Sequence, residues 1–509
     1  MKRYIQSVGY GLIGLFGVGS VSPAIAVITQ SNVGFRSVTP PNLAQANPAQ
    51  PSASQCAANL NTAINAITQQ PALSTAYWGI HVQPLQSSRP LYSSNGDRFF
   101  LPASNAKLLT TAAALASLTP QPPRSTPVFA TGQAPILNTL RIVGQGDPSF
   151  SDRNLEQIAQ ALKAKGVQSI GTLIGDDSLF QGRRLAPSWS WEDLQGGDGL
   201  AVNSLILNGN IILAKLAPQS LGQPLRLEWL TPTLPSSYRA VQNFSKTTDA
   251  GPEFVEVDRE EGQFLVFGQL RPGSAAKTAD VPVPDPGLAF LERLRAILQT
   301  QQIRVNRLSV TAIPSPQPGE ISVAAIPFPS LAALTAETNQ QSNNLYAETL
   351  LRLMGSRVSQ PAEASTPDRG LLVLRQTLTR LGIDPQGYRL VDGSGLSRKN
   401  LASPKALVDT LKAIAQSPHR EVFRASLAVA GQSGTLRQRF LNTPVAGRFY
   451  GKTGTLQGVS TLAGYLEMPA KPPLALSVLV NHSNQPHAVL RQATEQVVIA
   501  IARSASTCF

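Results

Sequence analysis

Ser104 and Lys107 are the first residues along the sequence whose types and spacing could do chemistry. They stand three positions apart at the start of an Ala- and Leu-rich segment that continues to Leu118 and is typical of a buried helix. On a helix, this spacing places both side chains on one face, about one turn apart. A neutral amine beside a serine hydroxyl can take its proton and create a nucleophile. The helix start adds backbone N–H groups and positive dipole potential near the reacting oxygen.

This pair is a weak signal on its own, because a serine at a helix start is commonly an N-cap. The same pattern recurs at Ser274 and Lys277, in a loop rich in proline and glycine with no apolar helix behind it. We therefore reject the second copy. The first copy needs further residues elsewhere in the chain to complete a site.

A second group, Lys452, Thr453, Gly454 and Thr455, lies on a predicted strand. Its lysine would add positive potential beside Lys107. A like charge and desolvation both lower the pKa of an amine, as a lysine base at neutral pH requires. Gly454 would allow a substrate or the nucleophile helix to approach the strand closely. The alternative is an ordinary exposed strand.

A third group, Ser342 and Asn344, opens a later helical pattern, and a plain helix cap is the alternative interpretation. The order of the three groups decides between the readings. A Ser-x-x-Lys at a helix start, a later Ser-x-Asn and a still later Lys-Thr-Gly on a strand form the signature of penicilloyl serine transferases.

With these motifs in place, the sequence resembles the D-alanyl-D-alanine carboxypeptidase/endopeptidases, the class C low-molecular-mass penicillin-binding proteins. The resemblance covers about residues 56–506. Other segments similar to the class are residues 102–110, 144–148, 176–178, 203–210, 392–397 and 433–436. The middle motif is Ser-Asn-Asn rather than Ser-Asp-Asn, which this class accepts and which puts a class A β-lactamase in doubt.

The resemblance implies a role for each catalytic residue. Ser104 would attack the carbonyl between two D-alanines, and Lys107 would be the general base. Ser342 would relay a proton towards the leaving amine, with Lys452 nearby. Water would then hydrolyse the acyl-enzyme.

The resemblance also implies the contacts that hold the substrate. Asn344 would bind the amide of the acyl side chain, while Thr453 and Thr455 would bind the terminal carboxylate beside Gly454. The backbone N–H groups of Ser104 and Thr455 would form the oxyanion hole, where a lost donor typically costs about 2.7–4 kcal/mol. The strand could also pair with an extended peptide.

The segments that must position these residues show two kinds of sequence pattern. Helical patterns dominate the beginning and end of the chain, whereas its middle has short apolar runs between Gly, Pro, Asn and Asp. The resemblance gives this pattern a fold class: α+β, a serine β-lactamase/DD-peptidase-like core with an antiparallel sheet flanked by helices, split by a β-rich insertion of two nested accessory domains. The expected parts are core residues 56–130, insertion 131–325 and core 326–509. Residues 76–85 and 98–101 are predicted strands around a turn at 95–97.

Composition excludes several other classes. The chain has 509 residues, four His, two Cys and a formal net charge of +13. The absence of His-Glu-x-x-His, Cys-x-x-Cys and a Walker loop argues against a zinc hydrolase, a dithiol redox enzyme and a P-loop ATPase. The chain contains no run of four or more Lys/Arg residues, so the sequence gives only a weak indication of nucleic-acid binding. We expect no metal and no cofactor. His81, His419, His482 and His487 stand in no triad context, so we interpret them as structural or surface residues.

The N-terminus predicts export. Lys2 and Arg3 precede an apolar segment, residues 7–21, and small residues at 24–26 suit signal peptidase. We expect a signal peptide over 1–26, with an uncleaved anchor as the alternative, and a flexible tether rich in Pro, Gln and Ser over 27–55. The protein would be periplasmic or in the cell envelope.

Export changes the interpretation of the cysteines, because disulfides persist outside the cytosol. Cys56 opens the folded region and Cys508 is the penultimate residue. Our hypothesis is that they pair and join the two ends of the split core. Two free thiols are the alternative, and non-reducing mass spectrometry would distinguish the two.

The predicted function is that of a serine DD-peptidase acting through an acyl-Ser104 intermediate. Its partners would be peptidoglycan stem peptides, cleaved at D-Ala-D-Ala and at D-Ala–meso-diaminopimelate cross-links, with β-lactams as covalent inhibitors. The positive charge suits peripheral association with an anionic wall or membrane, and the chain would bind no nucleic acid. The alternatives are a related esterase or β-lactam hydrolase, and a non-catalytic wall-binding protein, against which the three intact motifs argue.

Overall fold

The computed structural model describes residues 53–508, apart from 121–123, 239 and 313–316. Its largest sheet has six antiparallel strands in the order β17-β18-β19-β20-β1-β2. The strands are β1 (Tyr77–Pro84), β2 (Tyr92–Ser94), β17 (Ala428–Val429), β18 (Phe449–Leu456), β19 (Val459–Leu466) and β20 (Leu474–Asn481). The sheet is thus assembled from both ends of the chain, as the fold class predicts.

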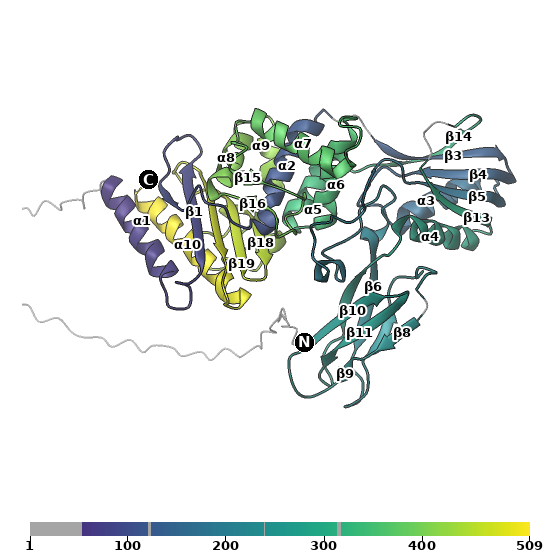
Figure 1. The fold of residues 1–509 in the computed structure, drawn as a ribbon, viewed down its shortest axis with the longest axis horizontal. Coiled ribbons are helices and arrows are strands. Elements are labelled where there is room, and N and C mark those ends of the chain that lie inside the picture. The colour runs from purple at the N-terminus through teal and green to yellow at the C-terminus, as the bar shows by residue number, and fades with distance from the viewer. Residues whose placement is uncertain (1–52, 121–123, 239, 313–316, 509) are drawn as a thin grey trace, which may run out of the picture.

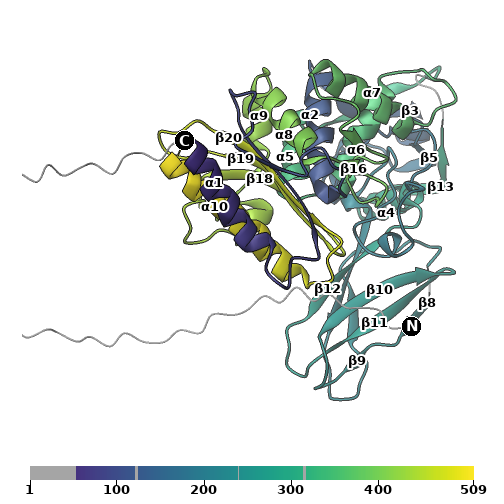
Figure 2. The ribbon, with the colours of Figure 1, turned by 60° about the vertical axis from the view of Figure 1, so that its left-hand side comes forward.

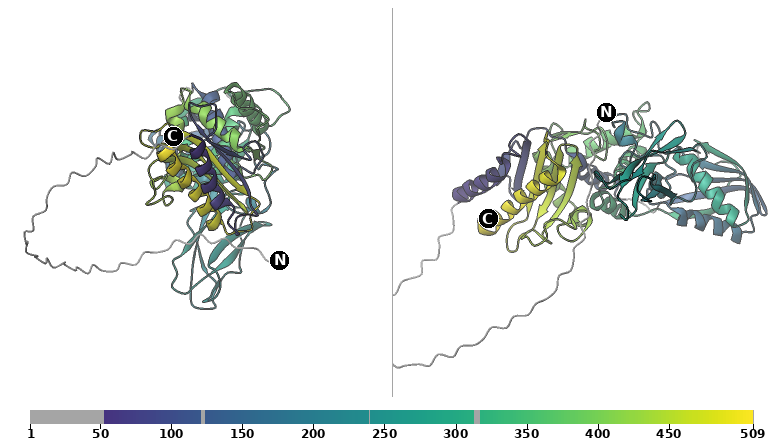
Figure 3. Two further views of the ribbon diagram at one scale, coloured as in Figure 1. Left: turned by 90° about the vertical axis from the view of Figure 1, so that its left-hand side faces the viewer. Right: turned by 90° about the horizontal axis from the view of Figure 1, so that it is seen from below.

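Helices cover both faces of this sheet (Figures 1 and 3). On one face, α1 and α10 pack side by side and bury apolar residues such as Leu476 and Val478 of β20. On the other face lie α2 and α5 to α9, against side chains such as Ala475 and Leu479. The core helices are α1 (Ala53–Thr68), α2 (Ala106–Leu118), α5 (Leu331–Gln340), α6 (Asn344–Ser356), α7 (Thr366–Arg380), α8 (Pro404–Ala415), α9 (Arg420–Ala425) and α10 (His487–Cys508).

Helix α2 is the central helix of the core. Residues 106–115 are all buried, because α5, α6, α7 and α8 surround it. Its many alanines let these neighbours approach closely, so the segment is apolar all round rather than on one stripe. Four short elements complete the described part of the core. They are η1 (Ala103–Asn105), which precedes α2, the paired strands β15 (Tyr388–Arg389) and β16 (Leu401–Ala402), and η4 (Gly434–Leu436) beside β17 and β18.

The insertion leaves the core after α2 and returns before α5. Its larger part is a five-stranded sheet in the order β13-β5-β4-β3-β14, with α3 and α4 packed on it (Figure 1). The elements are β3 (Ser125–Gln133), β4 (Ile136–Val143), α3 (Asp152–Ala164), β5 (Ser169–Asp176), α4 (Pro286–Thr300), β13 (Arg304–Thr311) and β14 (Ile321–Pro327). The expected limits of the insertion, between residues 130 and 131 and between residues 325 and 326, fall inside strands β3 and β14. We therefore propose the outer ends of these two strands as its limits.

A second accessory part is nested between β5 and α4, and Figure 2 shows it projecting away from the core. It has two small sheets, β12-β6-β7 and β10-β11-β8 with β9 beside β11. The strands are β6 (Ile211–Ala217), β7 (Arg226–Trp229), β8 (Ala240–Asn243), β9 (Lys246–Thr247), β10 (Phe254–Glu260), β11 (Gln263–Leu270) and β12 (Lys277–Pro282). Before them come the short turns η2 (Glu192–Leu194) and η3 (Asn208–Asn210).

Two local expectations differ from the structure. Residues 98–101 form no strand; Phe100 makes a single bridge to Ala402, and the hairpin partner of β1 is β2, before the turn. The apolar character of Phe100 reflects its place in the core, where its ring stacks on Tyr77, rather than a strand. Residues 53–55 of the predicted tether already belong to α1.

The signal peptide and residues 27–52 of the tether lie outside the described residues. Within the described ranges, no helix combines the length and apolar character that a bilayer span needs. Cys56 is buried and disulfide-bonded. Because the side chain of Cys508 is not among the described ones, its pairing with Cys56 stays a prediction.

Candidate active site

The turn that carries Ser104 is hydrogen-bonded to two strands of the core sheet. Leu101 donates its backbone N–H to Asn481 Oδ1 of β20 at 2.7 Å. Thr461 Oγ1 of β19 donates to the carbonyl of Pro102 at 2.9 Å. These contacts hold η1 at the sheet and present Ser104, half-buried, at the N-terminal end of α2.

Lys107 is fully buried one turn after Ser104. Its Nζ donates to Ser104 Oγ at 2.8 Å, to Asn344 Oδ1 at 2.6 Å and to the backbone carbonyl of Ser394 at 2.6 Å. An ammonium group has three N–H donors, so these three acceptors satisfy its protonated form. When the amine is neutral, its lone pair can accept the hydroxyl proton of Ser104.

Burial also sets the protonation of both lysines. Desolvation lowers the pKa of Lys107 to about 8, against the opposing negative charges of Asp392, Asp198 and Glu348. Burial, and then the positive charge of Lys107, hold the pKa of Lys452 well below its ordinary value. The site therefore makes a neutral amine accessible near physiological pH.

The Ser-x-Asn motif lies between the two lysines. Ser342, in a turn with a φ of 62°, accepts a hydrogen bond from Lys452 Nζ at 2.8 Å. Asn344 begins α6; its Oδ1 faces Lys107 and its Nδ2 donates to the carbonyl of Asp198 at 3.0 Å. Asn343 caps α6 through its side chain. A local helix cap and the candidate site thus share one motif.

Strand β18 forms the opposite wall. A Cβ on Gly454 would collide with Thr461 Oγ1 and lie 3.0 Å from the backbone N of Ser104, so only glycine fits this approach. Thr453 Oγ1 donates to Thr435 Oγ1 at 2.9 Å. Thr455 Oγ1 is 2.9 Å from Nε2 of His487, the first residue of α10.

A cavity of about 750 Å³ opens over these residues. All eight predicted catalytic and substrate-binding residues lie together: six line the cavity, and Lys107 and Lys452 are buried beneath it. The loop between β5 and β6 adds an acidic rim of Glu192, Asp193 and Asp198. The rejected pair, Ser274 and Lys277, contacts Glu253 and does not line this cavity.

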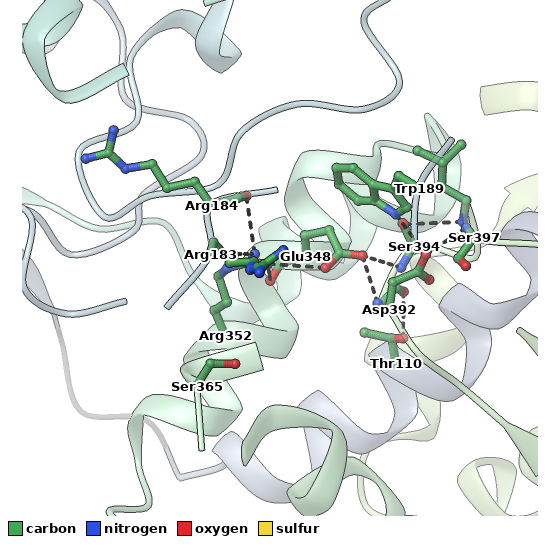
Figure 4. A network of polar contacts seen from close by, with 12 residues as sticks. Thr110, Arg183, Arg184, Trp189, Glu348, Arg352, Ser365, Asp392, Ser394 and Ser397 are labelled. Carbon is green, nitrogen blue, oxygen red and sulfur yellow. Dashed lines mark hydrogen bonds and ion pairs between the residues drawn. The ribbon is translucent and has the colours of Figure 1, made fainter. Parts of the chain in front are cut away.

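Behind Lys107 lies a buried polar network that the motifs did not predict (Figure 4). Glu348 Oε1 accepts from the backbone N–H groups of Gly393 and Ser394 at 2.8 and 2.9 Å. Its Oε2 pairs with Arg352 Nη1 at 3.2 Å, and both side chains are almost completely buried. Since the carbonyl of Ser394 accepts from Lys107, this pair supports the peptide unit next to the amine.

Asp392 is the second anchor of the same segment. Its carboxylate accepts from the backbone N–H groups of Gly395 and Ser397 at 2.7 Å each, and from Asn400 Nδ2 at 2.8 Å. Trp189 Nε1, from the loop between β5 and β6, donates to Asp392 Oδ2 at 3.0 Å (Figure 4). The only sequence signal for this anchor was the family-like segment 392–397.

Within the described ranges, no group of three or more His, Cys, Asp and Glu side chains could hold a metal ion. The candidate site offers Ser104, two buried amines, the Ser342 hydroxyl and the backbone N–H groups beside them for chemistry.

Comparisons with known proteins identify the family of the chain and its relatives. The model of the D-Ala-D-Ala carboxypeptidase 3 (S13) family matches residues 60–503. The D-alanyl-D-alanine carboxypeptidase of Actinomadura sp. (strain R39) is 32% identical over 500 residues, covering 92% of this chain and 89% of that protein.

Solved structures are similar in fold. The crystal structure of penicillin-binding protein 4 from Haemophilus influenzae has a TM-score of 0.75 at 23% identity, covering 86% of this chain and 99% of that one. The same protein complexed with a β-lactam has a TM-score of 0.71 at 22% identity, with the same coverage.

Proposed function

Because the chain belongs to the D-Ala-D-Ala carboxypeptidase 3 (S13) family and is a serine-type D-Ala-D-Ala carboxypeptidase, we propose that Ser104 carries the acyl group in its reaction. One observation carries this proposal: the buried Lys107 amine donates to Ser104 Oγ at 2.8 Å at the base of the 750 Å³ cavity. A hydroxyl beside an amine of lowered pKa is an activated nucleophile.

In the proposed reaction, neutral Lys107 takes the proton of Ser104 Oγ as this oxygen attacks the carbonyl carbon of the penultimate D-alanine. The backbone N–H groups of Ser104 and Thr455 stabilise the negative oxygen of the tetrahedral intermediate. The C–N bond then breaks, and the proton reaches the departing D-alanine amine by way of Ser342, which is held by Lys452. Water hydrolyses the Ser104 ester and restores the free hydroxyl.

The strand β18 is the proposed binding surface for the peptide. The partner strand β17 pairs only with Tyr450 and Gly451, so residues 453–456 of β18 have no strand on that side among the described residues. An extended stem peptide can add there as a further strand. Thr453 and Thr455 would then bind the terminal carboxylate, and Asn344 the acyl-side amide.

Arg398, which also lines the cavity, supports endopeptidase action as a second activity of the same site. A cross-linked substrate has a second stem peptide where the carboxypeptidase substrate has a free D-alanine. In a D-Ala–meso-diaminopimelate cross-link, the side-chain amine of the second stem's diaminopimelate forms the scissile amide, whereas the neighbouring carboxylate stays free and can pair with Arg398. Glu192 and Asp193 offer carboxylates to the free ammonium group of the diaminopimelate on the acyl-side stem.

We place the reaction outside the cytoplasm, where the stem peptides of peptidoglycan are accessible. The signal-like residues 1–26 and the net charge of +13, suited to an anionic wall, support this location. N-terminal sequencing of the protein from the cell envelope would begin at Val27 if the signal is cleaved. A first residue of Met1 would contradict this.

The test uses release of D-alanine from a D-Ala-D-Ala peptide together with labelling by a fluorescent penicillin. Ser104→Ala should abolish both. Ser274→Ala, which alters the second Ser-x-x-Lys copy, is the matched control and should retain both. Unchanged D-alanine release in a folded Ser104→Ala variant would contradict the proposal.

A further inference from the structure

We propose that the insertion positions the catalytic amine: residues 188–198, termed the insertion loop, orient two of the three oxygen acceptors of Lys107. The proposal rests on Lys107 being the general base. It assigns a part in catalysis to a segment that lies far from the three motifs in sequence and belongs to the accessory region.

The first acceptor is Asn344 Oδ1, 2.6 Å from Lys107 Nζ. A side-chain amide can place either its oxygen or its NH₂ towards a neighbour, and only the oxygen suits an ammonium group. The insertion loop removes this ambiguity, since the carbonyl of Asp198 accepts from Asn344 Nδ2 at 3.0 Å. A backbone carbonyl cannot donate, so the oxygen of the amide must face the lysine.

The second acceptor is the backbone carbonyl of Ser394, also 2.6 Å from Lys107 Nζ. Its orientation depends on Glu348, which accepts from the backbone N–H groups of Gly393 and Ser394, and on Asp392. The Asp392 carboxylate gathers donors from residues 395, 397 and 400 around it. In the described structure, Trp189 Nε1 is the one donor to this carboxylate from outside residues 392–400. Ser397 Oγ adds a second tie to the insertion loop by donating to the carbonyl of Ser188 at 3.1 Å.

Both contacts are sheltered from solvent. Trp189 is 8% exposed and Asp392 1% exposed. A hydrogen bond to a buried charged group is stronger than one between neutral groups, and its loss leaves the charge without that partner. Removing the indole N–H should therefore let the Asp392 carboxylate, and with it the Ser394 carbonyl, leave the position that suits Lys107.

Three carboxyl groups and a second amine face the Lys107 amine from the surrounding elements. They are Asp392 after β15, Glu348 on α6, Asp198 on the insertion loop and Lys452 on β18. The carboxylates and the acceptor oxygens favour the protonated amine. Lys452 is affected in the other direction, since burial and then the charge of Lys107 lower its pKa. Weakening the Ser394 acceptor should thus lower the pKa of Lys107 and move the acidic limb of the rate profile to lower pH.

The test is Trp189→Phe, which keeps an aromatic ring in the buried position and deletes only the N–H donor side of the indole. We expect kcat for D-alanine release to fall about tenfold, as the loss of a hydrogen bond to a charged group implies. KM should stay unchanged, because Trp189 does not line the cavity. The acidic limb of the kcat/KM profile should move to lower pH.

Trp191→Phe is the matched control. Trp191 lies two residues along the same loop, is 55% exposed and lines a separate cavity against β10 and β11. Its variant should retain the kcat and the pH profile of the wild type. Equal losses in both tryptophan variants, or wild-type behaviour of Trp189→Phe, would overturn the proposal.

A second variant covers the case in which Trp189→Phe does not fold. Ser397→Ala removes the hydrogen bond to the carbonyl of Ser188, together with the local acceptor of the Lys399 backbone N–H at 3.1 Å. It should give a smaller effect of the same direction, whereas wild-type kinetics would overturn the proposal. Penicillin labelling of Ser104 separates this proposal from the proposed function. If penicillin labels Ser104 in the wild type while Trp189→Phe keeps wild-type kinetics, the positioning role is wrong and the proposed function stands.

Discussion

The core sheet and the nested accessory part are built from similar strands, yet they differ in what surrounds them. All eight residues of β19, in the core sheet, are buried, whereas all four residues of β8 in the nested part are exposed. Two ion pairs, one from each region, show the same contrast. Glu348 and Arg352 are 2% and 1% exposed, and Lys215 and Glu228 on β6 and β7 are 39% and 52% exposed.

The contrast shows in which region a substitution can alter the properties of an ionisable group that it does not touch. In the core, two buried lysines and a buried ion pair share one packed environment, so a change at one group is felt at the others. In the nested part, exposed charged groups such as Lys215 and Glu228 are solvated, which weakens their interactions with one another. The insertion loop is the exception, because it belongs to the insertion by sequence and to the core by its contacts.

The largest expected effect comes from the catalytic amine. Lys107→Ala should lower kcat/KM for D-alanine release by about 10³, within the range of about 10²–10⁴ for a general base. Lys277→Ala, the lysine of the second Ser-x-x-Lys copy, should leave it unchanged. Comparable losses in the two variants, measured on the same peptide, would remove the distinction between core and nested part.

The next effect concerns stability. Glu348→Gln leaves the buried Arg352 without its charge partner, which should cost about 3–5 kcal/mol. The exposed pair is the comparison, and Glu228→Gln should change stability by about 0–1 kcal/mol. Denaturant unfolding followed by a probe of the core would measure both, and a Glu348→Gln variant as stable as Glu228→Gln would show that the buried pair is not a structural anchor.

The pH dependence is the third effect. Because the neutral amine of Lys107 is the active form and its pKa is about 8, kcat/KM should rise about tenfold per pH unit below that value and level off above it. Because this pKa is lowered only in the folded chain, the unfolded chain binds the Lys107 proton more tightly than the folded chain does. Stability from this group should therefore rise with pH between about 8 and 10.5.

A rate profile without an ascending limb near pH 8 would contradict the assignment of Lys107. The nested part offers the comparison here as well. Its Lys215 and Lys277 are 39% and 38% exposed, so replacing either lysine should leave the limb in place.

How much of this could be predicted from the sequence depended on whether a residue acts through its own side chain. Ser104 and Lys107 share one helical turn, and Lys452 and Gly454 share one strand, so local spacing identifies them. The acceptor at Ser394 is a backbone carbonyl, which every residue has, so the family-like segment 392–397 marks its place in the sequence but not its role.

Long-range partners were missed for a related reason. Trp189 and Asp392 are 203 residues apart, and no local pattern connects an indole to a carboxylate at that separation. His487 was interpreted as a structural or surface residue because it has no triad partner, yet it lies 2.9 Å from Thr455 once α10 returns to the sheet. Burial and chain topology, rather than residue type, bring both pairs together.

The central claim is that Ser104 forms the acyl-enzyme, and one measurement tests it most directly. The purified protein is incubated with a penicillin and digested, and the adduct is located by mass spectrometry. The structure predicts a single adduct of the intact penicillin mass on the peptide that contains Ser104, and none in Ser104→Ala. An adduct on another residue, or no adduct in the folded wild type, would contradict it.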